Sequence, residues 1–192
     1  MLVTYFIGAI PSGYLIAQRL RGIDIREHGS GNPGATNVYR VVGKKAGLLT
    51  LALDVLKGFL PVLFVRFVYP REAGTAALCG LTAIAGHNWS PFLNFKGGKG
   101  VATSGGVFLA LLPIPTIASV AAFGLTVKKT KHISAGSLAA AVTLPMAAFI
   151  IPTIQLYRFA AVVVGIVVIL KHKSNIQRLR EGTEPRYDEK KD

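Results

Sequence analysis

The stretch Val101–Val127, VATSGGVFLALLPIPTIASVAAFGLTV, contains no charged side chain. The next stretch, His132–Tyr157, carries no charge beyond a possible proton on its histidine. A helix that spans a membrane needs roughly 20 apolar residues. Across the chain, 51% of residues are hydrophobic and 16% are charged, whereas a soluble domain averages about 25% charged. The sequence therefore predicts an all-α polytopic membrane protein.

Seven hydrophobic segments are expected to be transmembrane helices, and residues 1–192 are expected to form a single integral-membrane domain. The tail 171–192 follows the last segment and is expected to lie in the cytoplasm. The first segment has no basic residue before its apolar part, which is typical of a retained span and not of a cleaved signal peptide. The segments are Leu2–Leu20, Ala46–Tyr69, Ala73–Trp89, Val101–Leu112, Ile114–Val127, Ser134–Ile151 and Ile154–Leu170.

Basic residues are concentrated in alternate loops. Most of the 22 Lys and Arg residues lie around residues 19–45, 96–99, 128–131 and in the tail. Because Lys and Arg collect in cytoplasmic loops, this pattern predicts the N-terminus outside and the C-terminus in the cytoplasm. It also accounts for the net charge of +13. The basic residues lack the interleaved aromatic residues that stack on bases, so nucleic acid is not an expected partner.

Val101–Val127 must cross the membrane twice for this topology to hold. Each half then has about 13 residues and a length of roughly 20 Å, which is short for a hydrocarbon core of about 30 Å. Pro113 and Pro115 mark a natural break. The alternative is one long tilted helix and six crossings. The charge pattern favours the hairpin, and bilayer thinning can accommodate short helices.

Cysteine and metal chemistry are not indicated. Cys79 is the only cysteine, so no intrachain disulfide can form, and its apolar neighbours indicate a small buried hydrophobic residue. The four histidines are far apart and show no metal-ligand spacing. Neither a metal nor a cofactor is expected. Within a span, Asp54 and Lys57 are three residues apart and are expected to pair, either as a structural pair or as a functional one.

The first of three polar clusters is GSGNPGATNVYR, residues 29–40. Glycines allow close approach of the backbone to a ligand, and successive N–H groups in such turns form anion-binding concavities. Arg40 adds a planar fork that suits phosphate. Taken alone, the cluster is more typical of a capped turn between helices than of a binding site. The candidate binding residues are Ser30, Gly31, Asn32, Gly34, Thr36, Asn37 and Arg40.

The second cluster, GHNWSPFLNFKGGKGVAT, covers residues 86–103. Lys96 and Lys99 flank paired glycines and can place two charges around one anion beside a helix N-terminus. The alternative is a basic turn whose lysines extend to lipid head groups. Trp89 is expected to be an interfacial anchor, and His87 is expected to hydrogen-bond and not to act as a base. The candidates here are His87, Lys96, Gly97, Gly98, Lys99 and Gly100.

The third cluster, KHKSNIQRLREGTEP, covers residues 171–185. It is expected to continue the last helix out of the membrane, which would place His172 and Asn175 on one face. Glu184 follows in a turn. A solvated basic tail is the alternative. Under the predicted topology all three clusters lie on the cytoplasmic face.

In their order and in their small polytopic frame, these clusters resemble the bacterial acyl-phosphate-dependent glycerol-3-phosphate acyltransferases, the PlsY family. The motifs that carry the resemblance are SGNPGATNVYR, GHNWSPFLNFKGGKGVA and HKSNIQRLREGTE, and the match covers nearly the whole chain. The resemblance implies transfer of a fatty acyl group from acyl phosphate to the 1-hydroxyl of sn-glycerol 3-phosphate. The implied products are lysophosphatidate and inorganic phosphate, in the first step of phospholipid synthesis. The implied location is the cell inner membrane.

The resemblance also implies functional residues. Ser30 and Arg40 correspond to essential residues, and the glycines around Lys99 to glycerol 3-phosphate binding. Lys99, His172 and Asn175 are expected to hold glycerol 3-phosphate, while the loop 30–37 and Arg40 hold the acyl phosphate. The implied catalytic set is Ser30, Arg40, Lys99, His172 and Asn175, with Glu184 among the binding residues.

The general base and a different function stay open at this stage. His172 and the substrate's own phosphate are both candidates for the base. A small anion or phosphate transporter is the alternative function, and a membrane scaffold is a third, although the polar residues do not continue to the bilayer midplane, where transporter sites lie. The lipid bilayer is an expected partner, and the chain is taken as monomeric. The sequence does not indicate the preferred acyl-chain length.

Overall fold

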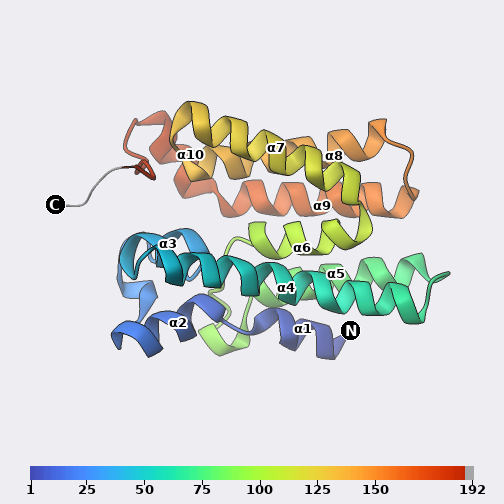
Figure 1. Ribbon diagram of the computed structural model, residues 1–192, viewed down its shortest axis with the longest axis horizontal. Coiled ribbons are helices and arrows are strands. Elements are labelled where there is room, and N and C mark those ends of the chain that lie inside the picture. Colours follow the sequence, from blue (N-terminus) through green and yellow to red (C-terminus); the bar gives the residue numbers. More distant parts are fainter. Residues whose placement is uncertain (189–192) are drawn as a thin grey trace. The chain divides into compact units, whose positions relative to one another are not determined.

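The computed structural model describes residues 1–188, which form α-helices, two short 3₁₀ helices and no strand. This part of the chain divides into two compact units, the first comprising Met1–Leu111 and the second beginning at Leu112 (Figure 1). The units are described separately, and the single-domain organisation stays a prediction. All-helical structure is confirmed for the described residues.

The first unit is organised around its longest helix, α4, which packs against α3, α5 and α6, while α1 packs against α5. The 3₁₀ helices Ile25–Glu27 and Pro91–Leu93 lie in its two long loops. The helices are α1 (Leu2–Ala9), α2 (Ser12–Arg21), α3 (Ala35–Val41), α4 (Lys44–Val68), α5 (Ala73–Asn88) and α6 (Val101–Leu111).

The second unit is a row of neighbouring helices in which α8 packs against both α7 and α9. Lys131, in the left-handed conformation, ends α7 and allows the tight connection to α8. The short α10 follows α9 after a bend at His172. The helices are α7 (Pro113–Thr130), α8 (Ile133–Ile150), α9 (Gln155–Lys171) and α10 (Lys173–Arg180).

The predicted hydrophobic segments coincide with helices. In two places the structure shows where a helix is interrupted. The run Val101–Val127 is two helices, because Leu112, which precedes Pro113, has the non-helical angles φ −137° and ψ 65°. The first segment was expected to be one helix, and this is wrong: it breaks between Ala9 and Ser12. Pro11 has no N–H to donate and biases Ile10 away from the helical region, so the helix ends there.

Side chains from two other parts of the first unit satisfy the carbonyl groups that this break exposes. The ammonium of Lys57 donates to the carbonyl of Ile10 at 2.8 Å, and the hydroxyl of Ser90 donates to the carbonyl of Ala9 at 2.7 Å. Irregular backbone at membrane depth is tolerated only where such partners exist or where it lines a cavity. The break is therefore a supported part of the fold.

Helices of the first unit approach one another through glycines. A Cβ atom at Gly58 would overlap the carbonyl oxygen of Thr103, and one at Gly106 would overlap the carbonyl oxygen of Val55, so α4 and α6 are in backbone contact. Small residues allow this close packing in lipid. Many large apolar side chains point outward, as Phe67 does at 85% exposed, although some, such as Phe108, are fully buried.

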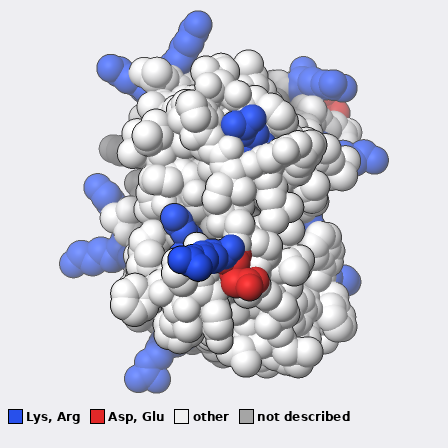
Figure 2. All heavy atoms as spheres, turned by 90° about the vertical axis from the view of Figure 1, so that its right-hand side faces the viewer, with Lys and Arg blue, Asp and Glu red and all other residues white. Residues whose placement is uncertain are grey.

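The sides of the helices carry exposed apolar side chains, such as Phe64 and Ile150, and suit a hydrocarbon environment. Figure 2 shows the end of the first unit at which α4 ends and α5 begins, where Lys and Arg side chains project from a mostly uncharged surface. Two helices, α4 and α8, are long and apolar enough to cross a membrane individually, and α9 with α10, bent by 58°, is a third candidate. Seven crossings and their orientation stay predictions.

Candidate active site

The first loop, residues 29–37, is organised by the buried amide of Asn37. Its Oδ1 accepts a hydrogen bond from the backbone N–H of Ser30 at 2.9 Å. Its Nδ2 donates to the carbonyl groups of Ile25 and His28 at 3.1 and 2.9 Å. Gly29 has a φ of 62°, and a Cβ there would overlap Oδ1 of Asn37. Asn37 therefore holds the loop in place from the interior of the protein. The sequence predicted a turn here but did not indicate which side chain organises it.

The rest of this loop leads directly into α3. Asn32 Oδ1 accepts from the N–H of Gly34 at 3.0 Å, which is a short turn before the helix begins at Ala35. Ser30 is exposed, and Arg40 lies in the last turn of α3 with its side chain partly buried. The loop thus presents Ser30 at the surface of the first unit.

The second loop, residues 96–100, folds back onto the end of α5. The N–H of Gly98 donates to the carbonyl of His87 at 3.0 Å, and α6 begins directly after Gly100. A Cβ at Gly98 would overlap the imidazole of His87, so only glycine allows this approach. Lys99 is therefore the last side chain before the closing Gly100 and the N-terminus of α6.

A buried ion pair lies beneath this loop, as the spacing of Asp54 and Lys57 predicted. Lys57 Nζ is 2.8 Å from Asp54 Oδ1, and the two side chains are 7% and 3% exposed. His87 Nδ1 lies 3.8 Å from the same carboxylate oxygen. A cavity of about 10 Å³, large enough for about one water molecule, lies among these three side chains, Pro33 and Gly98. The first and second loops therefore share a polar base inside the first unit.

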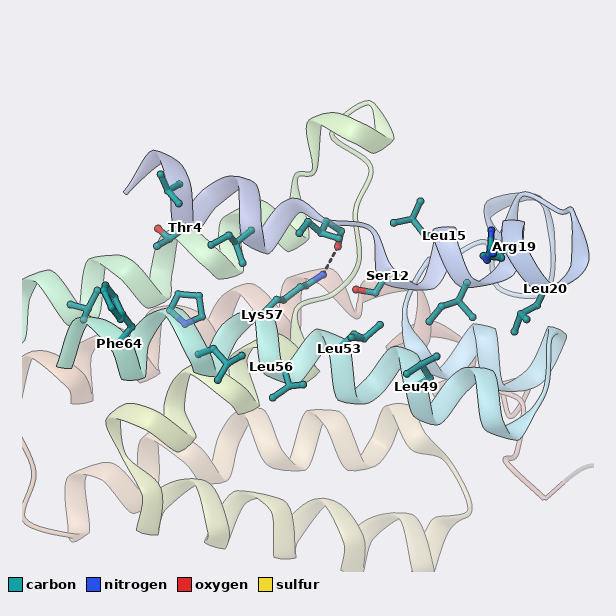
Figure 3. A pocket seen from close by; sticks show the side chains of 17 residues that line it. Thr4, Ser12, Leu15, Arg19, Leu20, Leu49, Leu53, Leu56, Lys57 and Phe64 are labelled. Carbon is teal, nitrogen blue, oxygen red and sulfur yellow. Dashed lines mark hydrogen bonds between the residues drawn. The ribbon is translucent and has the colours of Figure 1, made fainter. Parts of the chain in front are cut away.

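An apolar groove of about 1000 Å³ runs along the same unit between α1, α2 and α4. Figure 3 shows Thr4 and Phe64 toward one end, Lys57 in the middle and Arg19 toward the other end. Since its lining on α4 extends from residue 49 to residue 65, the groove is about 24 Å long at 1.5 Å per residue. Its size is at the upper end of small-molecule sites.

The third cluster is held together within the second unit. Asn175 Nδ2 donates to Glu184 Oε1 at 2.7 Å, and Arg178 Nε donates to Glu184 Oε2 at 2.7 Å. Glu184 is buried, which raises the pKa of its carboxyl, but hydrogen bonds from Asn175 and Arg178 outweigh burial and lower the pKa below its ordinary value. The residue is therefore an ionised carboxylate that fixes Asn175.

His172 lies at the bend between α9 and α10. The helix was expected to continue through residues 171–180, and this is wrong, because His172 leaves the helical region with φ −97° and ψ 10°. Its Nδ1 is 2.7 Å from the carbonyl oxygen of Val168. A carbonyl only accepts hydrogen bonds, so Nδ1 carries the proton and Nε2 has the lone pair in the neutral imidazole.

A sequence profile described as glycerol-3-phosphate acyltransferase matches residues 1–182. The chain belongs to the glycerol-3-phosphate acyltransferase family. The family's relative from Fusobacterium nucleatum is 46% identical over 97% of this chain and 96% of its own length. The relative from Trichlorobacter lovleyi is 49% identical over 95% of this chain and 93% of its own.

Solved acyltransferase structures share the fold. The crystal structure of PlsY (YgiH), described as an integral membrane glycerol 3-phosphate acyltransferase in its glycerol 3-phosphate form, is 37% identical and has a TM-score of 0.92. It covers 96% of this chain, and the chain covers 92% of it. The lysophosphatidic acid form has a TM-score of 0.89. The protein is thus an integral membrane acyltransferase, and the transporter alternative gains no support.

The structure groups the predicted acyltransferase site residues by unit. Those of the first and second clusters lie in two loops of the first unit that share the polar base described above. Those of the third cluster, His172, Asn175 and Glu184, lie together in the second unit. The members in the first unit are Ser30, Gly31, Asn32, Gly34, Thr36, Asn37, Arg40, His87, Lys96, Gly97, Gly98, Lys99 and Gly100.

Two partners were not predicted. Arg178 pairs with Glu184, and the opposite charges within one motif were the available signal. The position of His87 beside Asp54 had no local signal, because the two residues belong to different helices. Among residues 1–188, no three His, Cys, Asp or Glu side chains are placed to hold a metal ion.

Proposed function

We propose that this acyltransferase takes its acyl group from acyl phosphate. It would transfer the fatty acyl group to the 1-hydroxyl of sn-glycerol 3-phosphate and release lysophosphatidate and inorganic phosphate, in the first step of phospholipid synthesis. The hydroxyl oxygen attacks the acyl carbon, the C–O bond to phosphate breaks, and the hydroxyl proton passes to a base.

The observation that carries this proposal is the pair of glycine-rich loops on one polar base in the first unit. Both substrates have a phosphate group, and each loop can offer backbone N–H groups beside a cation: Arg40 in α3, the helix that follows the first loop, and Lys99 within the second loop. The solved relative has been described in a glycerol 3-phosphate form and in a lysophosphatidic acid form, which names one substrate and the product.

Each loop is assigned to one phosphate. The loop 30–37 and Arg40 bind the acyl phosphate, and Lys99 with the glycine-rich backbone around it binds glycerol 3-phosphate. Phosphate is a good leaving group, so no covalent enzyme intermediate is needed. Catalysis then consists of positioning and electrostatic stabilisation of the developing charge.

His172 is assigned as the general base, with Asn175 acting on the same acceptor substrate. The hydrogen bond to Val168 places the proton on Nδ1, so Nε2 is the nitrogen that can accept the hydroxyl proton. Histidine is the side chain that most often serves as a general base in enzymes. Glu184 serves by holding Asn175. The substrate phosphate is the alternative base.

The acyl chain is assigned to the apolar groove of the first unit. What supports this is its apolar lining and its length of about 24 Å along α4. Ile10, Ser12 and Lys57 line both this groove and the small polar cavity beneath the two loops. A chain in the groove therefore lies next to the polar base of the loops.

The membrane arrangement is proposed from the charge pattern. The chain crosses the inner membrane seven times as a monomer, with its N-terminus outside and the two loops and the tail at the cytoplasmic face. Support comes from the basic residues of alternate loops.

A purified-protein assay tests the reaction. The protein in detergent, given acyl phosphate and glycerol 3-phosphate, is expected to release equal amounts of inorganic phosphate and lysophosphatidate without another protein. Acyl-CoA and acyl carrier protein conjugates replace the donor in parallel reactions. Turnover with a thioester donor but none with acyl phosphate would overturn the donor assignment while leaving the family activity intact.

A further inference from the structure

We infer that Asp54, Lys57 and His87 form a positioning network that holds the loop 96–100 so that Lys99 meets the phosphate of glycerol 3-phosphate. This inference rests on the proposed assignment of Lys99 to that phosphate. None of the three side chains is required to touch a substrate; they act through the backbone on either side of Lys99.

The network is anchored at the break in the first helix. Lys57 Nζ lies 2.8 Å from the carbonyl oxygen of Ile10 and 2.8 Å from Asp54 Oδ1. Removing one member of such a buried ion pair leaves an uncompensated charge and is strongly destabilising. The Asp54 carboxylate therefore has a fixed place relative to α1, α2 and α4.

His87 connects this carboxylate to the loop. Its Nδ1 faces Asp54 Oδ1 across 3.8 Å, and its side chain is 9% exposed. The other face of the ring lies against Gly98, so closely that a Cβ atom there would overlap Nε2. In addition, the carbonyl of His87 accepts the N–H of Gly98 at 3.0 Å. Both the ring and the backbone of His87 thus determine where Gly98 lies.

Gly100, the neighbour of Lys99 on its other side, is also fixed in place. Gly100 has a φ of 80°, and a Cβ there would overlap the side-chain amide of Asn88. Consecutive residues at the end of α5 therefore support both neighbours of Lys99. A lysine side chain is long and flexible, so the direction of its ammonium depends strongly on how firmly its backbone is fixed. A misplacement of about 1 Å can cost about 100-fold in rate.

A positioning role and a purely structural role predict different effects on the KM values of the two substrates. A structural ion pair would affect the amount of folded protein and its melting temperature, with equal effects on both substrates. A positioning network acts on Lys99, so its loss affects glycerol 3-phosphate more than the acyl donor. The ratio of the two KM values separates these cases.

The test replaces the pair without leaving a buried charge. The double variant Asp54→Asn/Lys57→Met is expected to raise KM for glycerol 3-phosphate about tenfold, or about 1.4 kcal/mol, and to raise KM for the acyl donor by clearly less, because Lys57 also lines the acyl groove but is only one of its many lining residues. Lys57→Arg keeps a cation that can donate to both the carbonyl oxygen of Ile10 and Asp54 Oδ1. This variant is expected to retain most of the affinity for glycerol 3-phosphate. If the double variant does not accumulate, Asp54→Asn/Lys57→Gln is measured in the same way.

Arg66→Met is the matched control. Arg66 is also a cation of α4 that donates to a backbone carbonyl, that of Ala110, and it lies nine residues beyond Lys57 on the same helix, about 14 Å along its axis. It is expected to lower the melting temperature without changing the ratio of the two KM values. Equal changes in both KM values for the double variants, or failure of both double variants to fold while Arg66→Met folds, would overturn the inference. Unchanged affinity in Lys99→Met would instead refute the proposed role of Lys99.

Discussion

At the scale of single residues, the carboxylate of Glu184 is the most strongly held group of the second unit. Two side chains of α10 donate to its two oxygens, each at 2.7 Å, and it is 4% exposed. These bonds need the ionised form. Glu184 therefore supports the end of the chain and the amide of Asn175 at the same time.

The lowered pKa of Glu184 predicts the direction of an acid effect. Because the folded-state pKa lies below the unfolded value of about 4.3, its contribution is complete above that value and is lost as pH falls through the folded pKa. Melting temperatures measured in detergent from about pH 6 to about pH 3 should fall less steeply for Glu184→Gln. At neutral pH this variant should lose about 1 to 3 kcal/mol of stability. An identical slope in both proteins would contradict the prediction.

His172 gives a prediction about turnover. Glutamine cannot take up the hydroxyl proton, so His172→Gln is expected to lower kcat by about 100-fold or more. The measurement is kcat across about pH 6 to 9, the range around the histidine pKa of about 6.5. His172→Ala with added imidazole serves as a companion experiment. Near-normal turnover across this range would exclude histidine as the base and leave the substrate phosphate.

The polar residues show which contacts a sequence can predict. The pairing of Asp54 with Lys57 followed from a separation of three residues on a helix. The approach of His87 to the same carboxylate joins two different helices, and no local pattern encodes it. The three motifs contain the candidate site residues. That Asn37 supports the first loop and Glu184 supports Asn175 is visible only in the structure.

At the scale of helices, hydrophobic runs predicted where the long helices α4 to α9 lie, but not the short helix α3, which begins within the first polar cluster. They also did not predict the interruption of the first helix or the bend at His172. Pro11 was a visible signal for the first, but its consequence depends on Lys57 and Ser90, which come from distant parts of the chain. Continuity of a helix in lipid is therefore decided by tertiary partners as much as by local sequence.

Adjacent glycines of α6 provide a matched pair for the packing of α4 and α6. A Cβ at Gly106 would overlap the carbonyl oxygen of Val55, whereas one at Gly105 would meet no atom within 4 Å. Gly105→Ala is expected to stabilise the protein by about 0.4 to 1 kcal/mol. Gly106→Ala should destabilise it by about 1 to 3 kcal/mol. Thermal unfolding in detergent measures both, and equal effects would contradict backbone contact between these helices.

The apolar groove gives a prediction about donor length. Leu53 lines it, so Leu53→Trp is expected to fill part of it and to shift the preference toward shorter acyl phosphates, with kcat/KM for the longest donors lowered about tenfold. Leu63 is exposed on the same helix but does not line the groove, so Leu63→Trp is the control. The same chain-length profile in all three proteins would place the acyl chain elsewhere.

At the scale of the whole molecule, the predicted topology can be tested with chemical labels. Starting from Cys79→Ala, cysteines replace Arg71, in the connection from α4 to α5, or Lys45, at the start of α4; both positions are exposed. A membrane-impermeant maleimide added to intact spheroplasts should label position 71 and leave position 45 unlabelled until the membrane is opened. The reverse pattern would invert the orientation.

The close packing of the first unit through glycine also has a consequence for protein engineering. Its helices α4 and α6 meet through glycines and backbone contacts, while large apolar side chains such as Leu53, Leu56 and Phe67 project from α4. The side chains that adapt the chain to lipid are thus largely separate from those that join its helices. Exchanging the outward leucines that lie away from the groove for glutamate, lysine and glutamine is therefore a rational route to a water-soluble analogue with the same helix contacts.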